Sequence, residues 1–136
     1  MPTLIYKIEG RDAWEAAEAA ARYQGSADDA RDGFIHFSSR EQLAGTVAKH
    51  FAGRDNLVLV AVDAEALGDA LKWEPSRGGE LFPHLYGPLS LEAVIGVADL
   101  PLDAGGRHEV AGALQRIDER AEAAQGLQET ARGFAP

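Results

Sequence analysis

The stretch Leu57-Val58-Leu59-Val60-Ala61-Val62, near the middle of the chain, consists of six consecutive apolar residues. A strand that is apolar at every position has no polar side to turn to water. This stretch therefore predicts a central β-strand that is buried on both faces. Asp63 follows directly and can cap a short helical turn through Ala64 to Leu67. The rest of the chain must supply the strands beside this one and the helices over it.

Short runs of β-branched and aromatic residues predict four further strands. They are Thr3–Ile8, Phe34–Ser38, Leu71–Glu74 and Leu91–Val97. Helices separate the earlier strands and loops separate the later ones. This order predicts an α+β fold, in which a split mixed or antiparallel sheet carries flanking helices. We expect one domain over residues 1–125, followed by a polar tail at 126–136 whose composition is typical of a disordered terminus.

Three segments have the pattern of amphipathic helices. The first runs through the alanine-rich Trp14–Tyr23 and is expected to end at Gly25. The second follows residues 38–41, which have the Ser-x-x-Glu spacing of a capping box. The third is expected over about residues 107–124. Residues 25–33, between the first two helices, are polar and predict an irregular loop.

The composition excludes several kinds of site and partner. The chain has no cysteine, which excludes disulfides and thiolate metal sites and fits a reducing compartment. It shows neither a signal peptide nor an apolar run of membrane-spanning length, so we expect a cytoplasmic protein without a membrane partner. Its net charge of -9 repels polyanions, so nucleic acid is not an expected partner. Nothing in the composition indicates an oligomeric state.

The segment Lys72–Leu89 has the composition of a binding or catalytic site. It holds one Trp, two Glu, one Arg, one His, one Tyr, three Gly and three Pro. Glycine and proline fix the backbone, while the other residues donate, accept and shuttle protons. Its two basic residues balance its two acidic ones. The segment is thus neutral within an acidic protein, and a small anionic or zwitterionic ligand is allowed there.

Phe34–Ser38 supplies a second group of candidate residues. Side chains alternate along a strand, so His36 and Ser38 share one face and Ile35 and Phe37 the other. We expect the apolar pair to face the core and the polar pair to line a cleft, although Phe34 then falls on the polar side. In the alternative interpretation, His36 is bonded to the backbone and Ser38 only caps a helix.

If residues 82–86 are extended, Phe82, His84 and Tyr86 share a face that suits stacking on a planar ring. The alternative is a rigid loop that closes over the core. Glu74 could accept from a ribose hydroxyl or act as a base, or it could pair with Arg77 at the surface. Arg77 could instead bind a phosphate or carboxylate. The histidine spacings match no metal motif, and no metal is expected.

Several uncommon motifs occur in an order that resembles the domain of unknown function 952 (DUF952) family, over about residues 3–100. They are Tyr6-Lys7-Ile8, Gly33–Ser38 (GFIHFS), Lys72-Trp73-Glu74 and Leu81–Leu89 (LFPHLYGPL). The family has no established activity. Its fold resembles that of the ADP-ribosyltransferases, a split sheet that grips nicotinamide adenine dinucleotide (NAD).

The Ile35–Ser38 segment (IHFS) is also similar to the Val-His-Leu-Ser segment of the RNA 2'-phosphotransferases, which belong to the same fold group and use NAD. Only His36 and Ser38 carry over from that motif. Asp32-Gly33-Phe34 stands where those enzymes have an arginine–histidine pair. This departure and the acidic surface argue against phosphotransfer to RNA.

The resemblance implies a nucleotide-sized cleft, with residues 73–89 as one wall and the Phe34–Ser38 strand as the opposite wall. It implies cleavage or transfer at the N-glycosidic bond of NAD or a related nucleotide, with NAD as a substrate. The expected catalytic residues are His36, Glu74 and His84, and the expected ligand-binding residues are Tyr6, Ser38, Trp73, Arg77 and Tyr86. The alternative is a non-catalytic module that binds a nucleotide or metabolite or docks a partner protein.

In that scheme each group has a role. Tyr86 or Trp73 would stack on the base, while His36 and Ser38 would bond the ribose. Glu74 would stabilise the developing oxocarbenium charge. His84 would bind phosphate or act as an acid or base near neutral pH.

Overall fold

A computed structural model describes residues 3–133, apart from the side chains of Arg77 and residues 124–133. The α-helices are α1 (Arg11–Ala20), α2 (Ala27–Asp32), α3 (Leu43–His50) and α4 (Val110–Gly133). Short 3-10 helices are η1 (Ala64–Ala70), η2 (Arg77–Gly79) and η3 (Leu91–Ala93). Every strand pairing within this described part is antiparallel, which confirms the α+β class with antiparallel sheets.

The main sheet is built around the apolar stretch at residues 57–62. Its strands are β1 (Leu4–Gly10), β4 (Leu57–Asp63) and β8 (Val94–Leu100), in the order β1-β4-β8. Residues 57–62 are all at most 2% exposed, so the prediction of a central, doubly buried strand is confirmed. The predicted turn after it is also confirmed, because Asp63 accepts a hydrogen bond from the Glu65 backbone N–H at the start of η1.

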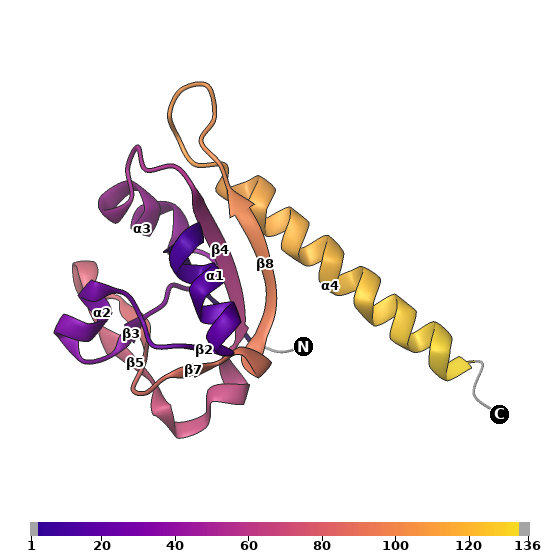
Figure 1. The fold of residues 1–136 in the computed structure, drawn as a ribbon. Coiled ribbons are helices and arrows are strands. Elements are labelled where there is room, and N and C mark those ends of the chain that lie inside the picture. Colours follow the sequence, from indigo (N-terminus) through magenta and orange to yellow (C-terminus); the bar gives the residue numbers. More distant parts are fainter. Residues whose placement is uncertain (1–2, 134–136) are drawn as a thin grey trace.

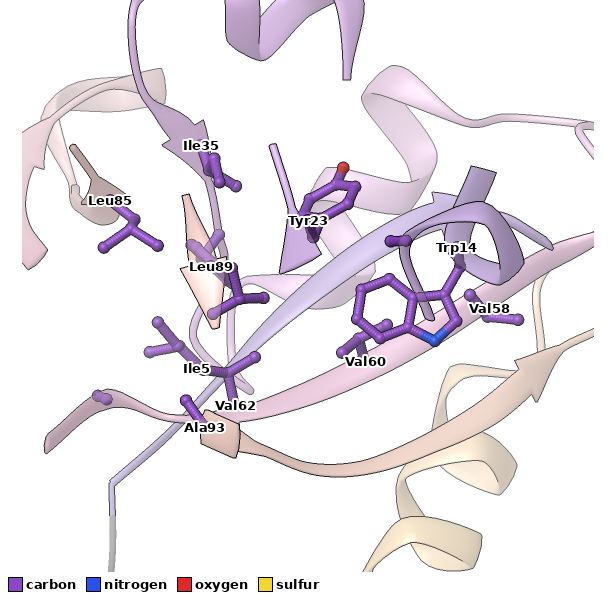
Figure 2. Close-up of a cluster of buried hydrophobic side chains, with 13 residues drawn as sticks. Ile5, Trp14, Tyr23, Ile35, Val58, Val60, Val62, Leu85, Leu89 and Ala93 are labelled. Carbon is purple, nitrogen blue, oxygen red and sulfur yellow. The ribbon is translucent and has the colours of Figure 1, made fainter. Parts of the chain in front are cut away.

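Alternation along β4 divides the interior into two hydrophobic clusters. Val58, Val60 and Val62 face a cluster that includes Trp14 of α1 and Tyr23 (Figure 2). Leu57, Leu59 and Ala61 face a second cluster, to which α3 and α4 contribute Leu43, Val47, Ala113, Leu114 and Ile117. In Figure 1, α1 lies over β4 while α4 runs beside β8. Each large side chain buried in this way contributes roughly 1.5–3 kcal/mol, so β4 anchors both layers.

A second sheet stands beside the main one. Its strands are β3 (Ile35–His36), β6 (Leu81–Leu85) and β5 (Leu71–Pro75), in the order β3-β6-β5, and β2 (Arg22–Tyr23) pairs separately with β7 (Leu89–Ser90). The two larger sheets meet where Tyr6 and Ser38 exchange backbone hydrogen bonds of 2.8 and 2.9 Å. The β-structure is thus split into two sheets that touch at this bridge. The bridge places the β3-β6-β5 sheet beside β1.

The predicted loop at residues 25–33 is wrong, because α2 occupies most of it. Ser26 caps this helix: its Oγ accepts from the Asp29 N–H at 3.2 Å, and the Asp29 carboxylate accepts from the Ser26 N–H at 2.8 Å. The helix has only six residues and no apolar stripe, so periodicity did not reveal it. The first helix also ends earlier than predicted. Ala21 adopts the left-handed conformation expected of Gly25, and Arg22–Tyr23 then continues as a strand.

The capping box predicted at residues 38–41 is also wrong. Ser38 is held in the bridge to Tyr6, and α3 begins only at Leu43. At the C-terminal side, Leu91–Ala93 forms η3, so the predicted strand at Leu91–Val97 begins later, at Val94. Helix α4 begins at Val110 and its backbone continues to Gly133, beyond the predicted end at residue 124. No helix among the described residues is long and apolar enough to cross a membrane.

Candidate functional site

The register of the second sheet gathers three of the expected residues on one face. Lys72 of β5 pairs with His84 of β6, which pairs in turn with His36 of β3. Residues paired across strands share a face, and Glu74, two residues from Lys72, shares it as well. The segments expected to form opposite walls of a cleft are therefore neighbouring strands of one sheet. Trp73 lies on the other face, where it pairs with Pro83.

Glu74 holds His84 in one orientation. The Glu74 Oε1 atom lies 2.9 Å from His84 Nδ1 and accepts a hydrogen bond of 2.7 Å from the Tyr86 hydroxyl. The bonds from Tyr86 and then His84 lower the pKa of Glu74, and the bond to Glu74 raises the pKa of Tyr86. A carboxylate that accepts from Nδ1–H leaves Nε2 of a neutral imidazole as a proton acceptor. His84 is 4% exposed, and among the described residues its Nε2 has no hydrogen-bond partner.

His36 is held differently, by two carboxylates of α2. Its Nδ1 lies 2.5 Å from Asp29 Oδ1, and its Nε2 lies 3.0 Å from Asp32 Oδ2. The two nitrogens donate at the same time only when the ring is protonated. The backbone N–H of His36 also donates to Asp29, at 3.1 Å. His36 is thus bonded to side chains, and both of its ring nitrogens are occupied.

Asp29 is the centre of this network, and the sequence analysis missed it. It is 2% exposed and accepts a 2.7 Å hydrogen bond from Lys7 Nζ, which is itself buried. Burial alone would raise the pKa of Asp29, but the bond from His36 and the charge and bond of Lys7 outweigh it and hold that pKa well below its usual range. Two signals point to this pair: a Ser-x-x-Asp spacing at residues 26–29, and a lysine within the apolar first strand.

Ring contacts with the two histidines explain why Phe34 lies on the polar side of its segment. Its ring stacks on the His84 ring, with centroids 4.0 Å apart, and lies 4.6 Å from the His36 ring. The two imidazole centroids are 5.6 Å apart. Phe34 also lies 5.3 Å from the Tyr86 ring, so it packs the histidines and Tyr86 into one aromatic group. This packing restricts the motion of His84.

An open cavity of about 310 Å³ lies beside this face. Of the expected site residues, the cavity is lined by Tyr6, His36, Ser38 and His84. Trp73, Glu74 and Tyr86 lie outside its lining, and the side chain of Arg77 lies outside the described residues. Phe82, which was expected to share the ring-stacking face of His84, lines the cavity as well. Further lining residues that sequence reasoning missed are Lys7, Asp29, Asp32, Thr46 and Lys49.

Two lining residues are already committed to internal bonds. The Tyr6 hydroxyl accepts a 3.4 Å bond from Arg40, which pairs with Asp118 at 2.9 Å, and burial raises the pKa of Tyr6. The Ser38 hydroxyl lies 2.8 Å from that of Thr46. No group of three His, Cys, Asp or Glu side chains in the described part of the chain is arranged to hold a metal ion. His84 is therefore a lining group whose orientation is fixed by Glu74 and whose Nε2 has no hydrogen-bond partner in the described part of the chain.

The chain matches the model of a family described as a protein of unknown function (DUF952) over residues 8–97. It is similar to protein CC0527 from Caulobacter crescentus, whose crystal structure is 56% identical in sequence, with a TM-score of 0.79; the match covers 83% of this chain and 99% of that chain. The solution NMR structure of CC0527 is also 56% identical, with a TM-score of 0.73 and coverage of 80% and 94%. No curated protein matches the chain. Because the family model spans well over half of the 136 residues, the chain belongs to the DUF952 family.

Proposed function

We propose that the cavity binds a nucleoside-containing small molecule of the ADP-ribose class, and that His84 acts there as a general acid or base at the N-glycosidic bond. The observation that carries this proposal is the buried His84, which lines the cavity, is oriented by Glu74 and has no hydrogen-bond partner for Nε2 among the described residues. An imidazole held in one tautomer by a carboxylate is the common arrangement for proton transfer near neutral pH. The split antiparallel sheet supports the ADP-ribosyltransferase-like assignment that the motif resemblance implies.

The lining suits such a ligand. Phe51 and Phe82 offer apolar surface for a ring, and the Ser38–Thr46 hydroxyl pair can exchange bonds with ribose. Lys49 lines the cavity, forms no ion pair with any described residue, and can attract a phosphate. Ligand sites run from about 300 to 1,000 Å³. A cavity of about 310 Å³ therefore favours burial of one nucleoside-sized part, with the rest of a dinucleotide outside.

With NAD as substrate, the proposed reaction is hydrolysis or transfer of the ADP-ribosyl group. An acceptor oxygen, from water in hydrolysis, bonds to the anomeric carbon while its proton passes to Nε2 of His84. The bond between that carbon and the nicotinamide nitrogen breaks, and its electron pair neutralises the pyridinium ring as nicotinamide leaves. Glu74 acts as a positioning residue through His84, because it lies outside the cavity lining.

The test combines calorimetric titration with ADP-ribose and NAD and chromatographic detection of free nicotinamide. We expect both ligands to bind and nicotinamide to appear. His84→Gln should lower turnover by roughly 10²–10⁴-fold while changing ADP-ribose affinity only a few-fold. Trp73→Phe is the matched control, because Trp73 lies beside Glu74 in sequence but on the opposite face of the sheet. No heat from either ligand at millimolar concentration would contradict the proposal.

The second candidate is a non-catalytic binding module. It is favoured by the fact that both nitrogens of His36 and the hydroxyls of Tyr6 and Ser38 are already bonded within the protein. The same experiment separates the two candidates. Binding of ADP-ribose without release of nicotinamide from NAD would support the module.

A further inference from the structure

Helix α2 forms part of the cavity wall and buries no apolar side chain. Ala27 and Ala30 are exposed, and Asp29 is its one buried residue. Asp29, Arg31 and Asp32 all line the cavity. Short helices in proteins are ordinarily stabilised by an apolar face packed on the core. Since α2 lacks such a face, polar contacts must hold it in place.

Those contacts converge on His36 and Lys7. Asp29 and Asp32 stand three residues apart on α2, so both carboxylates reach the single imidazole of His36, at 2.5 and 3.0 Å. Lys7 Nζ of β1 binds the other oxygen of Asp29 at 2.7 Å. Three charge-assisted bonds thus tie the helix to two strands.

Glycines in the left-handed region flank α2 on both sides. Gly25 has φ 98° and Gly33 has φ 86°. At Gly25, an added Cβ would lie 2.8 Å from the Asp29 Cβ, so only glycine allows the chain to pass that close to the network. Glycine rotates at low cost, so both ends of the segment have the backbone freedom of a hinge.

We propose that α2 is a hinged gate on the cavity and that His36 is the latch that holds it closed. His36 is then a positioning residue, and His84 is the group that acts on the ligand. The identity of the ligand that this gate admits rests on the function proposed above. The existence of the latch does not rest on it, because the latch consists of contacts within the protein.

The charges around His36 set the direction of its pH dependence. Asp29 and Asp32 face it from α2, His84 faces it from β6, and Lys7 of β1 acts through Asp29. Arg31 also binds Asp32 and competes for that carboxylate. A protonated His36 donates to both carboxylates, whereas the neutral ring donates to one.

The latch is therefore complete while the His36 ring is protonated, and it weakens when the ring loses that proton as pH rises. Protonation of the carboxylates would also release it. That happens only in stronger acid, because the pKa values of Asp29 and Asp32 are both lowered.

Amide hydrogen exchange of the full chain without ligand tests the latch. The reporters are the N–H groups of Ala30 and Gly33, which donate to Ser26 and Asp29 within the α2 segment. After correction for intrinsic rates, we expect their protection to fall about tenfold between pH 5.5 and 8, the equivalent of one charge-assisted bond. The amides of β4 should not change. Equal α2 protection at both pH values, or a parallel loss in β4, would overturn the proposal.

Two variants and a matched control sharpen this test. Asp32→Asn removes the charge from one side of the latch, and we expect its α2 protection at pH 5.5 to approach that of the wild type at pH 8. Asp28→Asn is the matched control, because Asp28 is an exposed α2 carboxylate that pairs with Arg31 and not with His36. His36→Gln should abolish the pH dependence. If His36→Gln unfolds the protein, the comparison of Asp32→Asn with Asp28→Asn tests the latch instead. Equal α2 amide protection in these two variants would refute the latch.

A cysteine probe tests whether the helix gates the cavity. The chain has no cysteine, so Thr46→Cys places a unique thiol in the cavity lining. At pH 6, a neutral maleimide should label it about tenfold faster in the Asp32→Asn background than in the Asp28→Asn background. Equal rates would show that α2 moves without controlling access. Neither measurement uses a nucleotide, so failure of the ligand titrations and failure of the latch can be told apart.

Discussion

Strand β4 and residues 82–85 of β6 are both buried, but for different physical reasons. Along β4, every side chain from 57 to 62 packs into one of two apolar clusters. In β6, Leu85 joins the core on one face while His84 on the other is held by Glu74 and stacked on Phe34. Burial of β4 thus depends on apolar area. Burial of the polar face depends on hydrogen bonds and ring contacts between its side chains, and the candidate chemistry resides there.

Removing the Asp29 carboxylate, which is the centre of the polar network around His36 and Lys7, should have the largest effect on stability. Asp29→Ala leaves Lys7 buried without its carboxylate, and we expect the free energy of unfolding to fall by about 4 kcal/mol. Urea denaturation measures this loss. The exposed Asp28 provides the control, because Asp28→Ala removes a carboxylate from the same helix. Replacing both partners, as in Lys7→Met with Asp29→Leu, should recover only the part of the loss that comes from the unpaired Lys7, because His36 and Ser26 still lose their acceptor. If Asp29→Ala is as stable as Asp28→Ala, this account is contradicted.

The same pair makes stability depend on pH. The pKa of Asp29 is lower in the folded protein than in the unfolded chain, where it is about 3.9. Its contribution is therefore complete above that unfolded value and is lost as pH falls toward the folded value. Acid denaturation of the wild type should show this loss below about pH 4, and Lys7→Met with Asp29→Leu should not.

Breaking the apolar strand should have a somewhat smaller effect that does not vary with pH. Leu59 is fully buried at the centre of β4. We expect Leu59→Ala to lower the free energy of unfolding by about 3 kcal/mol, through lost transfer energy and the cavity left behind. Ile95→Ala on β8 is the control, because Ile95 is 42% exposed. The loss should be equal at pH 5 and 8, and a pH-dependent loss would show that the two faces are coupled.

The smallest effect is expected at the edge of the polar face. Tyr86→Phe removes the hydroxyl that bonds Glu74, while the ring can remain beside Phe34. Because that bond is the largest cause of the lowered pKa of Glu74, the pKa should rise toward its ordinary value. Carboxyl NMR shifts followed through a pH titration measure the change. Stability should change by less than about 0.5 kcal/mol, and an unchanged pKa would show that His84 alone perturbs Glu74.

Local patterns predicted the parts of the fold that depend on local properties. The unbroken apolar run identified β4, and alternation placed Ile35 and Phe37 in the core with His36 on the other face. Strand alternation also limits which of the expected residues can line the same cavity. Neighbouring residues of a strand point to opposite faces, so Trp73 and Glu74 could not both line one cleft. Helix α2 was missed because a six-residue helix without an apolar stripe carries no periodic signal.

Residue type and spacing within a few positions were therefore sufficient to predict the central strand, the α+β class and the two short segments from which the site is assembled. Strand register and charge pairing depend on chain segments that meet across the fold. They set His36 opposite His84, 48 positions away, and bring Lys7 to Asp29, 22 positions away. No local pattern encodes those distances. The folded chain alone could show that one histidine is bound on both sides by carboxylates, while the other has a ring nitrogen without a partner among the described side chains.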